Sequence, residues 1–135
     1  MRYFILGILI VLVISGCDSQ PEAVRAGDPV IEETEENGEY TIEGHEIYKE
    51  IVTQEEIKQV KILIDQFESM NKSPEKVSAP PDLFFELYEP ENSVSIHQFY
   101  VWTNTKGRAT VRNSDGDYYR VNEEDTETLL ELLRK

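Results

Sequence analysis

The stretch that decides the fold is residues 95–121, with the sequence SIHQFYVWTNTKGRATVRNSDGDYYRV. Its three runs of β-branched and aromatic residues are separated by two short polar segments, and each of these segments contains a glycine. This pattern is typical of antiparallel strands joined by tight turns. It predicts a three-stranded meander with strands at 95–103, 108–112 and 117–121.

The register of the second hairpin follows from its glycine. A three-residue loop over 114–116, with Gly116 in the left-handed conformation, pairs Val111 with Tyr119 and collects the apolar side chains on one face. A two-residue loop would set Val111 opposite Arg120, which mixes an apolar and a charged side chain on the core face. We therefore expect the three-residue loop.

The other face of the meander combines arginines with aromatic residues. Its composition depends on the loop at Gly107: three residues place Tyr100 and Trp102 on the arginine side, whereas four place His97, Phe99 and Val101 there. Tyr, Trp and Arg dominate binding hot spots. An ordinary solvated face, or one covered by a helix, explains the same residues more simply. The candidate binding face consists of Tyr100, Trp102, Arg108, Arg112, Tyr118 and Arg120.

Two helices are expected around the meander. Thr53 and Glu56 form a capping-box pattern ahead of an amphipathic segment at 54–70, where apolar residues recur at helical spacing. Asn122 can cap a final helix whose leucines form an apolar face.

Two further strands complete the expected fold, at 46–52 and 83–88. Antiparallel hairpins with segregated helices define an α+β protein. We expect a small two-layer sandwich over residues 41–135, in which an antiparallel meander of three to five strands packs on two helices.

The N-terminus has the features of a secretory signal. Residues 4–14 are apolar apart from one glycine, a run too short for a membrane span of about 20 residues. The tetrapeptide Ile14-Ser15-Gly16-Cys17 resembles a lipobox, the motif that is read during bacterial lipoprotein maturation. The resemblance implies a signal peptide at 1–16, a lipid anchor on Cys17 and a location on the outer face of the cytoplasmic membrane. The alternative is an uncleaved anchor with an incidental cysteine.

Acidic residues dominate the composition, with 27 Asp and Glu against 13 Lys and Arg and a net charge of −14. Nucleic-acid binding needs basic residues that displace counterions from phosphates, so a nucleic-acid partner is not expected. Residues 32–36 are the densest acidic run, with proline and glycine nearby and few apolar residues. We expect residues 17–40 to form a disordered, extended acidic tether, which is a simpler explanation than a calcium-collecting segment.

Neither catalytic nor cofactor-binding motifs stand out. The sequence contains no nucleophile elbow, P-loop, dinucleotide fingerprint or paired histidine motif, so an enzyme and a cofactor are not expected. A weak calcium-loop candidate has Tyr118 where such a loop needs glycine, and a hairpin turn explains it equally well. That candidate comprises Asn113, Asp115, Asp117 and Glu124.

The last third of the chain resembles the C-terminal part of small membrane-anchored bacillar proteins of the YhfM-like type. This resemblance implies a fold and a Gram-positive source. The family has no established activity, so it implies no catalytic residue. The residues that carry it are Val111, Asp115-Gly116, Tyr118-Tyr119, Val121, Asp125-Thr126 and the leucines of the final helix.

These observations favour a membrane-anchored, non-catalytic binding module for a protein or another envelope component. An immunity or inhibitor lipoprotein that neutralises a basic toxin or hydrolase is the alternative, and a calcium-binding protein is a third, weaker one.

Replacing Cys17 with alanine should abolish fatty-acid labelling and release the protein from firm membrane association, because two acyl chains supply stable anchoring. Metabolic labelling and membrane fractionation measure both effects, with Ser19→Ala as the matched control. The lipoprotein interpretation would be contradicted if the Cys17→Ala protein stayed as firmly bound to the membrane and the wild type carried no fatty-acid label.

Overall fold

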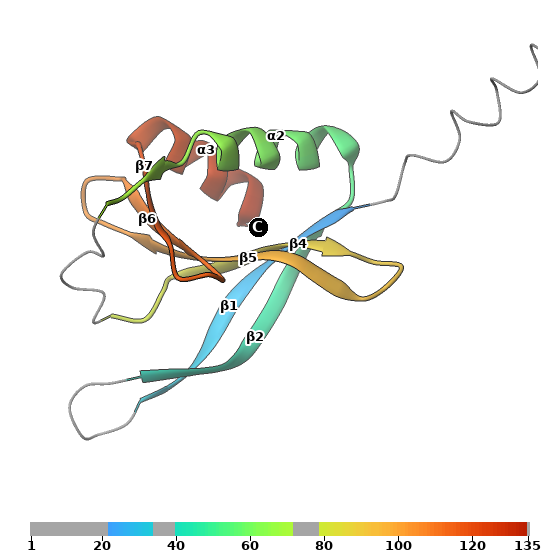
Figure 1. The fold of residues 1–135 in the computed structure, drawn as a ribbon, viewed down its shortest axis with the longest axis horizontal. Coiled ribbons are helices and arrows are strands. Elements are labelled where there is room, and N and C mark those ends of the chain that lie inside the picture. The colour runs from blue at the N-terminus through green and yellow to red at the C-terminus, as the bar shows by residue number, and fades with distance from the viewer. Residues whose placement is uncertain (1–21, 34–39, 72–78, 135) are drawn as a thin grey trace, which may run out of the picture.

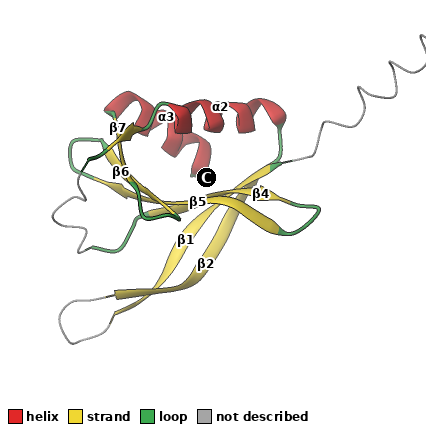
Figure 2. Cartoon of the chain, in the orientation of Figure 1, coloured by secondary structure: helices red, strands yellow, loops and turns green. Residues whose placement is uncertain are grey.

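Seven antiparallel strands form one sheet in the computed structural model, which describes residues 22–33, 40–71 and 79–134. Both helices lie on the same side of this sheet (Figures 1 and 2). The α+β, two-layer expectation is confirmed, although the sheet is larger than three to five strands. In chain order the elements are β1 (Ala23–Glu33), β2 (Tyr40–Ile51), α2 (Gln54–Asp65), β3 (Glu68–Ser69), β4 (Leu83–Glu89), β5 (Val94–Thr103), β6 (Ala109–Asn113), β7 (Tyr118–Val121) and α3 (Glu123–Leu133).

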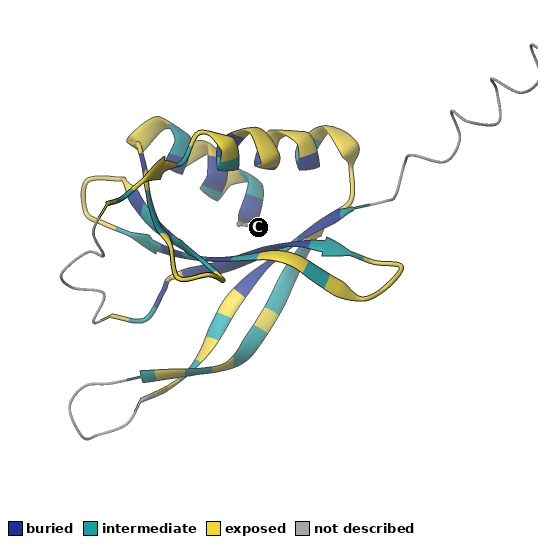
Figure 3. Ribbon diagram, in the orientation of Figure 1, coloured by how far each residue is buried: buried dark blue, intermediate teal, exposed yellow. Residues whose placement is uncertain are grey.

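The hydrophobic core lies between the sheet and the two helices (Figure 3). The rings of Phe85 and Phe99 stack there with centroids 4.8 Å apart. Burial of each large apolar side chain contributes about 1.5–3 kcal/mol relative to leaving it exposed. The sheet supplies Val24, Leu83, Phe85, Val101, Val111 and Val121, and the helices supply Ile57, Val60, Leu63, Leu129 and Leu133.

The expectation of an acidic tether is wrong for residues 23–33. These residues form β1, which lies inside the sheet between β2 and β4, and Val24 and Ala26 are fully buried. Residues 24–27 pair with both β2 and β4 and bury small apolar side chains, and residues 28–33 pair with β2 alone. These interactions order the segment despite the acidic residues around it. Most of the remaining expected tether, the expected signal peptide and the lipobox-like tetrapeptide with Cys17 lie outside the described residues.

The β1–β2 hairpin extends past β4 as a two-stranded arm, comprising residues 28–33 and 40–46 (Figure 1). Register shifts occur after Ala26 and after Val30. Gly27 lies at the first shift, where a Cβ atom would overlap the Glu46 carbonyl and come within 2.8 Å of the Ile47 Cα. A residue without a side chain is therefore needed where β1 and β2 cross into the arm.

The observed helix boundaries agree in part with those predicted from the sequence. Asn122 caps α3 as expected, because its Oδ1 accepts from the Asp125 amide at 2.8 Å. The Thr53 hydroxyl donates to the Glu56 carboxylate at 2.8 Å and makes no bond to the helix backbone. α2 ends at Asp65 rather than at residue 70, since the chain turns and β3 joins the edge of the sheet beside β7.

The two C-terminal hairpins use the same turn. In each, an asparagine Oδ1 accepts from backbone amides two and four residues ahead, at 2.9–3.1 Å, and a left-handed glycine closes the loop. Val111 lies opposite Tyr119, which confirms the three-residue loop at Gly116. The loop at Gly107 also has three residues, so Tyr100 and Trp102 share a face with the arginines.

Replacing Gly27 with alanine should lower the free energy of unfolding by about 1–3 kcal/mol, because the added methyl group overlaps backbone that cannot move independently of the sheet. Thermal unfolding of the full chain in detergent, followed by circular dichroism, measures the change. Gly44→Ala in the partner strand is the matched control, since a Cβ there meets nothing within 4 Å. Equal stability of the two variants would contradict the close approach at Gly27.

Candidate binding face

The predicted binding residues lie on the sheet face opposite the helices. Directly opposed residues on neighbouring antiparallel strands share a face. One cross-strand row runs from Tyr100 through Arg112 to Tyr118, and a second runs from Trp102 through Thr110 to Arg120. Within the described residues, both helices pack on the other face, so these rows have no helical cover (Figure 2).

A buried aromatic cluster forms one end of this face. His45 from β2 stacks on Phe84 with centroids 3.7 Å apart and planes at 10°, and its Nε2 lies 2.7 Å from the Tyr100 hydroxyl. Phe84 is fully buried although it points away from the helices. Sequence reasoning missed both residues. The adjacent Phe84 and Phe85 could have indicated this cluster, because neighbouring strand residues place one ring on each face of the sheet.

Burial sets the protonation of this cluster. It lowers the pKa of His45 below the usual value of 6.5, an effect that the nearby Glu86 carboxylate partly opposes. A neutral His45 lets Nε2 accept a hydrogen bond from the Tyr100 hydroxyl. Burial likewise raises the pKa of Tyr100, with Arg112 acting in the opposite direction.

Tyr40 connects the arm to the far side of this face. Burial raises its pKa first, the Tyr118 hydroxyl raises it further, and Arg112 lowers it. Charges interact more strongly where water is partly excluded, so the ionisation of Tyr40 is coupled to Tyr118 of β7 and to Arg112 of β6. β2 and β7 are five places apart in the strand order, so this coupling links the arm to strands that are not its neighbours in the sheet.

The charged group at the centre of the sheet is satisfied internally. Glu86 is only 6% exposed, and one of its oxygens lies 3.5 Å from the Arg25 guanidinium. Gln98 donates to its other oxygen at 3.4 Å, and Arg25 lies 4.6 Å above the Tyr88 ring. These contacts compensate a carboxylate that would otherwise be costly to bury.

Trp102 is half-buried at the end of its row. Its Nε1 donates to the Ala79 carbonyl at 2.8 Å, and its ring centroid lies 6.4 Å from that of Tyr118. Asp82 accepts from both the amide and the hydroxyl of Thr103, at 2.7 and 2.9 Å, which ties the segment before β4 to the end of β5.

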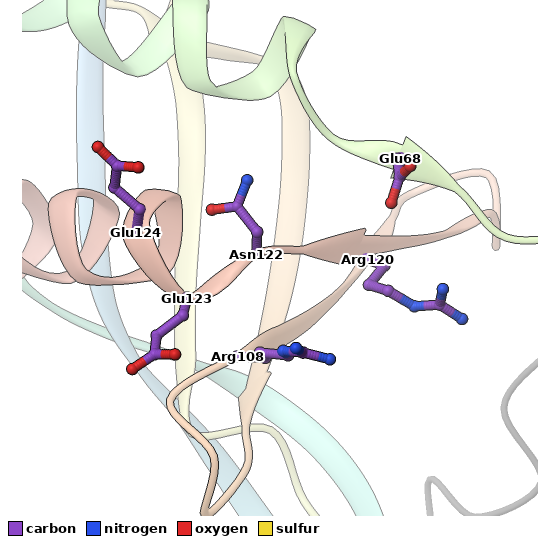
Figure 4. Close-up of a pocket in the computed structure, with 6 residues that line it drawn as sticks. All are labelled: Glu68, Arg108, Arg120, Asn122, Glu123 and Glu124. Atoms are coloured by element: carbon purple, nitrogen blue, oxygen red, sulfur yellow. The ribbon is translucent and has the colours of Figure 1, made fainter.

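Arg108 and Arg120 line a pocket of about 490 Å³ beside β7 (Figure 4). Both side chains are exposed. In the described part of the chain, ion pairs within 4.0 Å join only Arg25 to Glu86 and Lys61 to Glu22. The remaining residues that line the pocket are Glu68, Asn122, Glu123 and Glu124.

The structure does not assemble the calcium-loop candidate. The Asn113 Oδ1, which would be a ligand, accepts from the Asp115 and Asp117 amides at 3.0 and 2.9 Å. Glu124 lies in the first turn of α3. Over residues 22–33, 40–71 and 79–134, no three His, Cys, Asp or Glu side chains are grouped to hold a metal ion. Hairpin geometry accounts for Asn113, Asp115 and Asp117.

The architecture defines a small α+β protein in which helices cover one face of a single antiparallel sheet and aromatic and arginine residues occupy the other. The chain belongs to the YhfM family, whose model, described as YhfM protein, matches residues 33–135. No curated protein and no solved structure matches the chain. None of the helices formed by the described residues is long and apolar enough to cross a membrane.

Nuclear magnetic resonance titration of the His45 ring should give a midpoint below 6.5. Because the folded pKa is then below the unfolded one, the unfolded chain takes up this proton first as pH falls. Folding stability should therefore decrease as pH drops below about 6.5 until His45 also becomes protonated in the folded protein. His45→Phe should reduce this decrease, and a wild-type midpoint at or above 6.5 would contradict the prediction.

Proposed function

We propose that this protein is a lipid-anchored, non-catalytic binding module on the outer face of the bacterial cytoplasmic membrane. It engages a protein or another envelope component through the sheet face that carries Tyr100, Arg112 and Tyr118. One observation carries the proposal: α2 and α3 both pack on the opposite face, which leaves an aromatic and arginine surface without a helical layer in the described chain.

The composition of this surface supports a binding role. Interface centres are enriched in Tyr, Trp and Arg, because these side chains bury a large area while keeping a polar group available. The His45 ring stacks on Phe84 and bonds to Tyr100. Its contacts support the packing of the face, in keeping with a non-catalytic role.

Anchoring at Cys17 would hold the folded part close to the membrane. β1 begins at Ala23, so only residues 18–22 separate the lipidated cysteine from the sheet. At about 3.5 Å per extended residue, this segment reaches roughly 20 Å at most. A tether over the whole of 17–40 would have reached several times farther. The partner would therefore be at the membrane surface or in the adjacent envelope layer.

A second candidate function is the neutralisation of a basic toxin or hydrolase. It is supported by the net charge of −14 and by the acidic first turns of both helices. Such a partner would dock on the helical layer rather than on the aromatic face. The two candidates thus predict contacts on opposite sides of the sheet.

Photo-crosslinking in cells distinguishes these candidates. A photoreactive phenylalanine derivative in place of Tyr118 should give a specific crosslinked species, whereas the same group in place of the exposed Lys58 on α2 should not. The double substitution Arg112→Glu and Arg120→Glu should abolish the Tyr118 crosslink while changing the free energy of unfolding by less than about 1 kcal/mol. Crosslinking from Lys58 alone would support the basic-partner candidate and contradict the first one.

A further inference from the structure

Three arginines surround Thr110 on the sheet face opposite the helices. Arg108 and Arg112 lie two residues to either side of it along the chain, and Arg120 lies directly opposite it on β7. Residues two apart on a strand face the same side about 6.6–6.8 Å apart, and directly opposed residues are closer. We call Arg108, Arg112 and Arg120 the arginine triad.

The triad has an acidic neighbour, since Glu68 of β3 lies directly opposite Arg120, but it makes no close ion pair with a described residue. Acidic residues outnumber basic ones by 27 to 13, yet among the described residues no carboxylate lies within 4.0 Å of a triad guanidinium. Arg25, by contrast, pairs with Glu86 on the same face. Three like charges without a close ion pair repel one another, and an anion bound between them would relieve this repulsion.

We propose that the triad binds a side-chain or terminal carboxylate of a peptide segment in a protein partner. An apolar side chain beside that carboxylate packs on Tyr118 and Trp102. Guanidinium groups present planar pairs of N–H donors that match the two oxygens of a carboxylate. This inference rests on the proposed function, because it assigns the chemistry of the ligand to the same face.

The surrounding charges favour a peptide carboxylate over a continuous polyanion. Glu68, Glu123 and Glu124 line the pocket that contains Arg108 and Arg120 (Figure 4). A chain of phosphates that crossed the triad would meet these carboxylates, and the net charge of −14 would oppose its approach. A peptide can place one carboxylate between the arginines and an uncharged or basic group beside the glutamates.

Selection from a displayed random heptapeptide library tests this assignment. The full chain in detergent is the target, and a variant with all three changes Arg108→Gln, Arg112→Gln and Arg120→Gln is screened in parallel. The wild type should enrich peptides with Asp or Glu next to an apolar or aromatic residue, and the variant should not. Amidation of the carboxylate in a selected peptide should weaken binding about ten-fold or more, and added salt should weaken it too.

Lys58→Gln is the matched control, because it removes one exposed positive charge from α2 on the other side of the sheet, and it should leave peptide affinity unchanged. Enrichment of peptides without carboxylates, with binding lost on Tyr118→Ser, would overturn the ligand assignment and leave the binding face intact. Enrichment of no peptide by either protein would count against the binding face itself. Triad-dependent binding of a polyphosphate of about 20 units that is tighter than that of any selected peptide would overturn the proposal in favour of a polyanion site.

Discussion

The insertion of β1 between β2 and β4 is the constraint on which the rest of the structure depends. β1 hydrogen-bonds on both sides, buries Val24 and Ala26 in the core, and joins the β2 arm to the meander formed by β4–β7. Without it, β2 would have no neighbour in the sheet, and His45 would not reach Phe84. Gly27 allows this insertion because the β2 backbone passes where a side chain would be.

The two faces of the sheet differ in composition and in what they contribute to the protein. The helix side removes apolar area from water and supplies most of the stabilisation. The other side keeps polar and aromatic groups, and its single deeply buried carboxylate, Glu86, has Arg25 and Gln98 as partners. The arginine triad lacks such partners in the described residues. Arginines without a close ion pair, next to Tyr118 and Trp102, are the feature that distinguishes this surface from an ordinary solvated sheet.

Much of the C-terminal fold could be predicted from local sequence. The glycines at 107 and 116 follow asparagines at the same spacing, and the turn chemistry that they share sets both hairpin registers. The register of the second hairpin was predictable because one alternative buried an arginine. Once the register was known, the face shared by Arg112, Tyr118 and Arg120 followed from the two-residue period of a strand.

By itself, the sequence determined the two helices, the meander, the N-cap at Asn122 and the arginines that share a face with Tyr118, because these depend on periodicity and on contacts a few residues apart. It left open which residues of β5 join that face, and the structure places Tyr100 and Trp102 there. Only the tertiary structure decided that residues 23–33 form a strand and that residues 24–27 lie between two neighbours, since the partners of residues 24–27 are about 20 and 60 residues away along the chain. It also decided that His45, Phe84 and Tyr100 meet. These three residues come from three strands and meet only because the sheet curves. The local sequence does not predict that curvature.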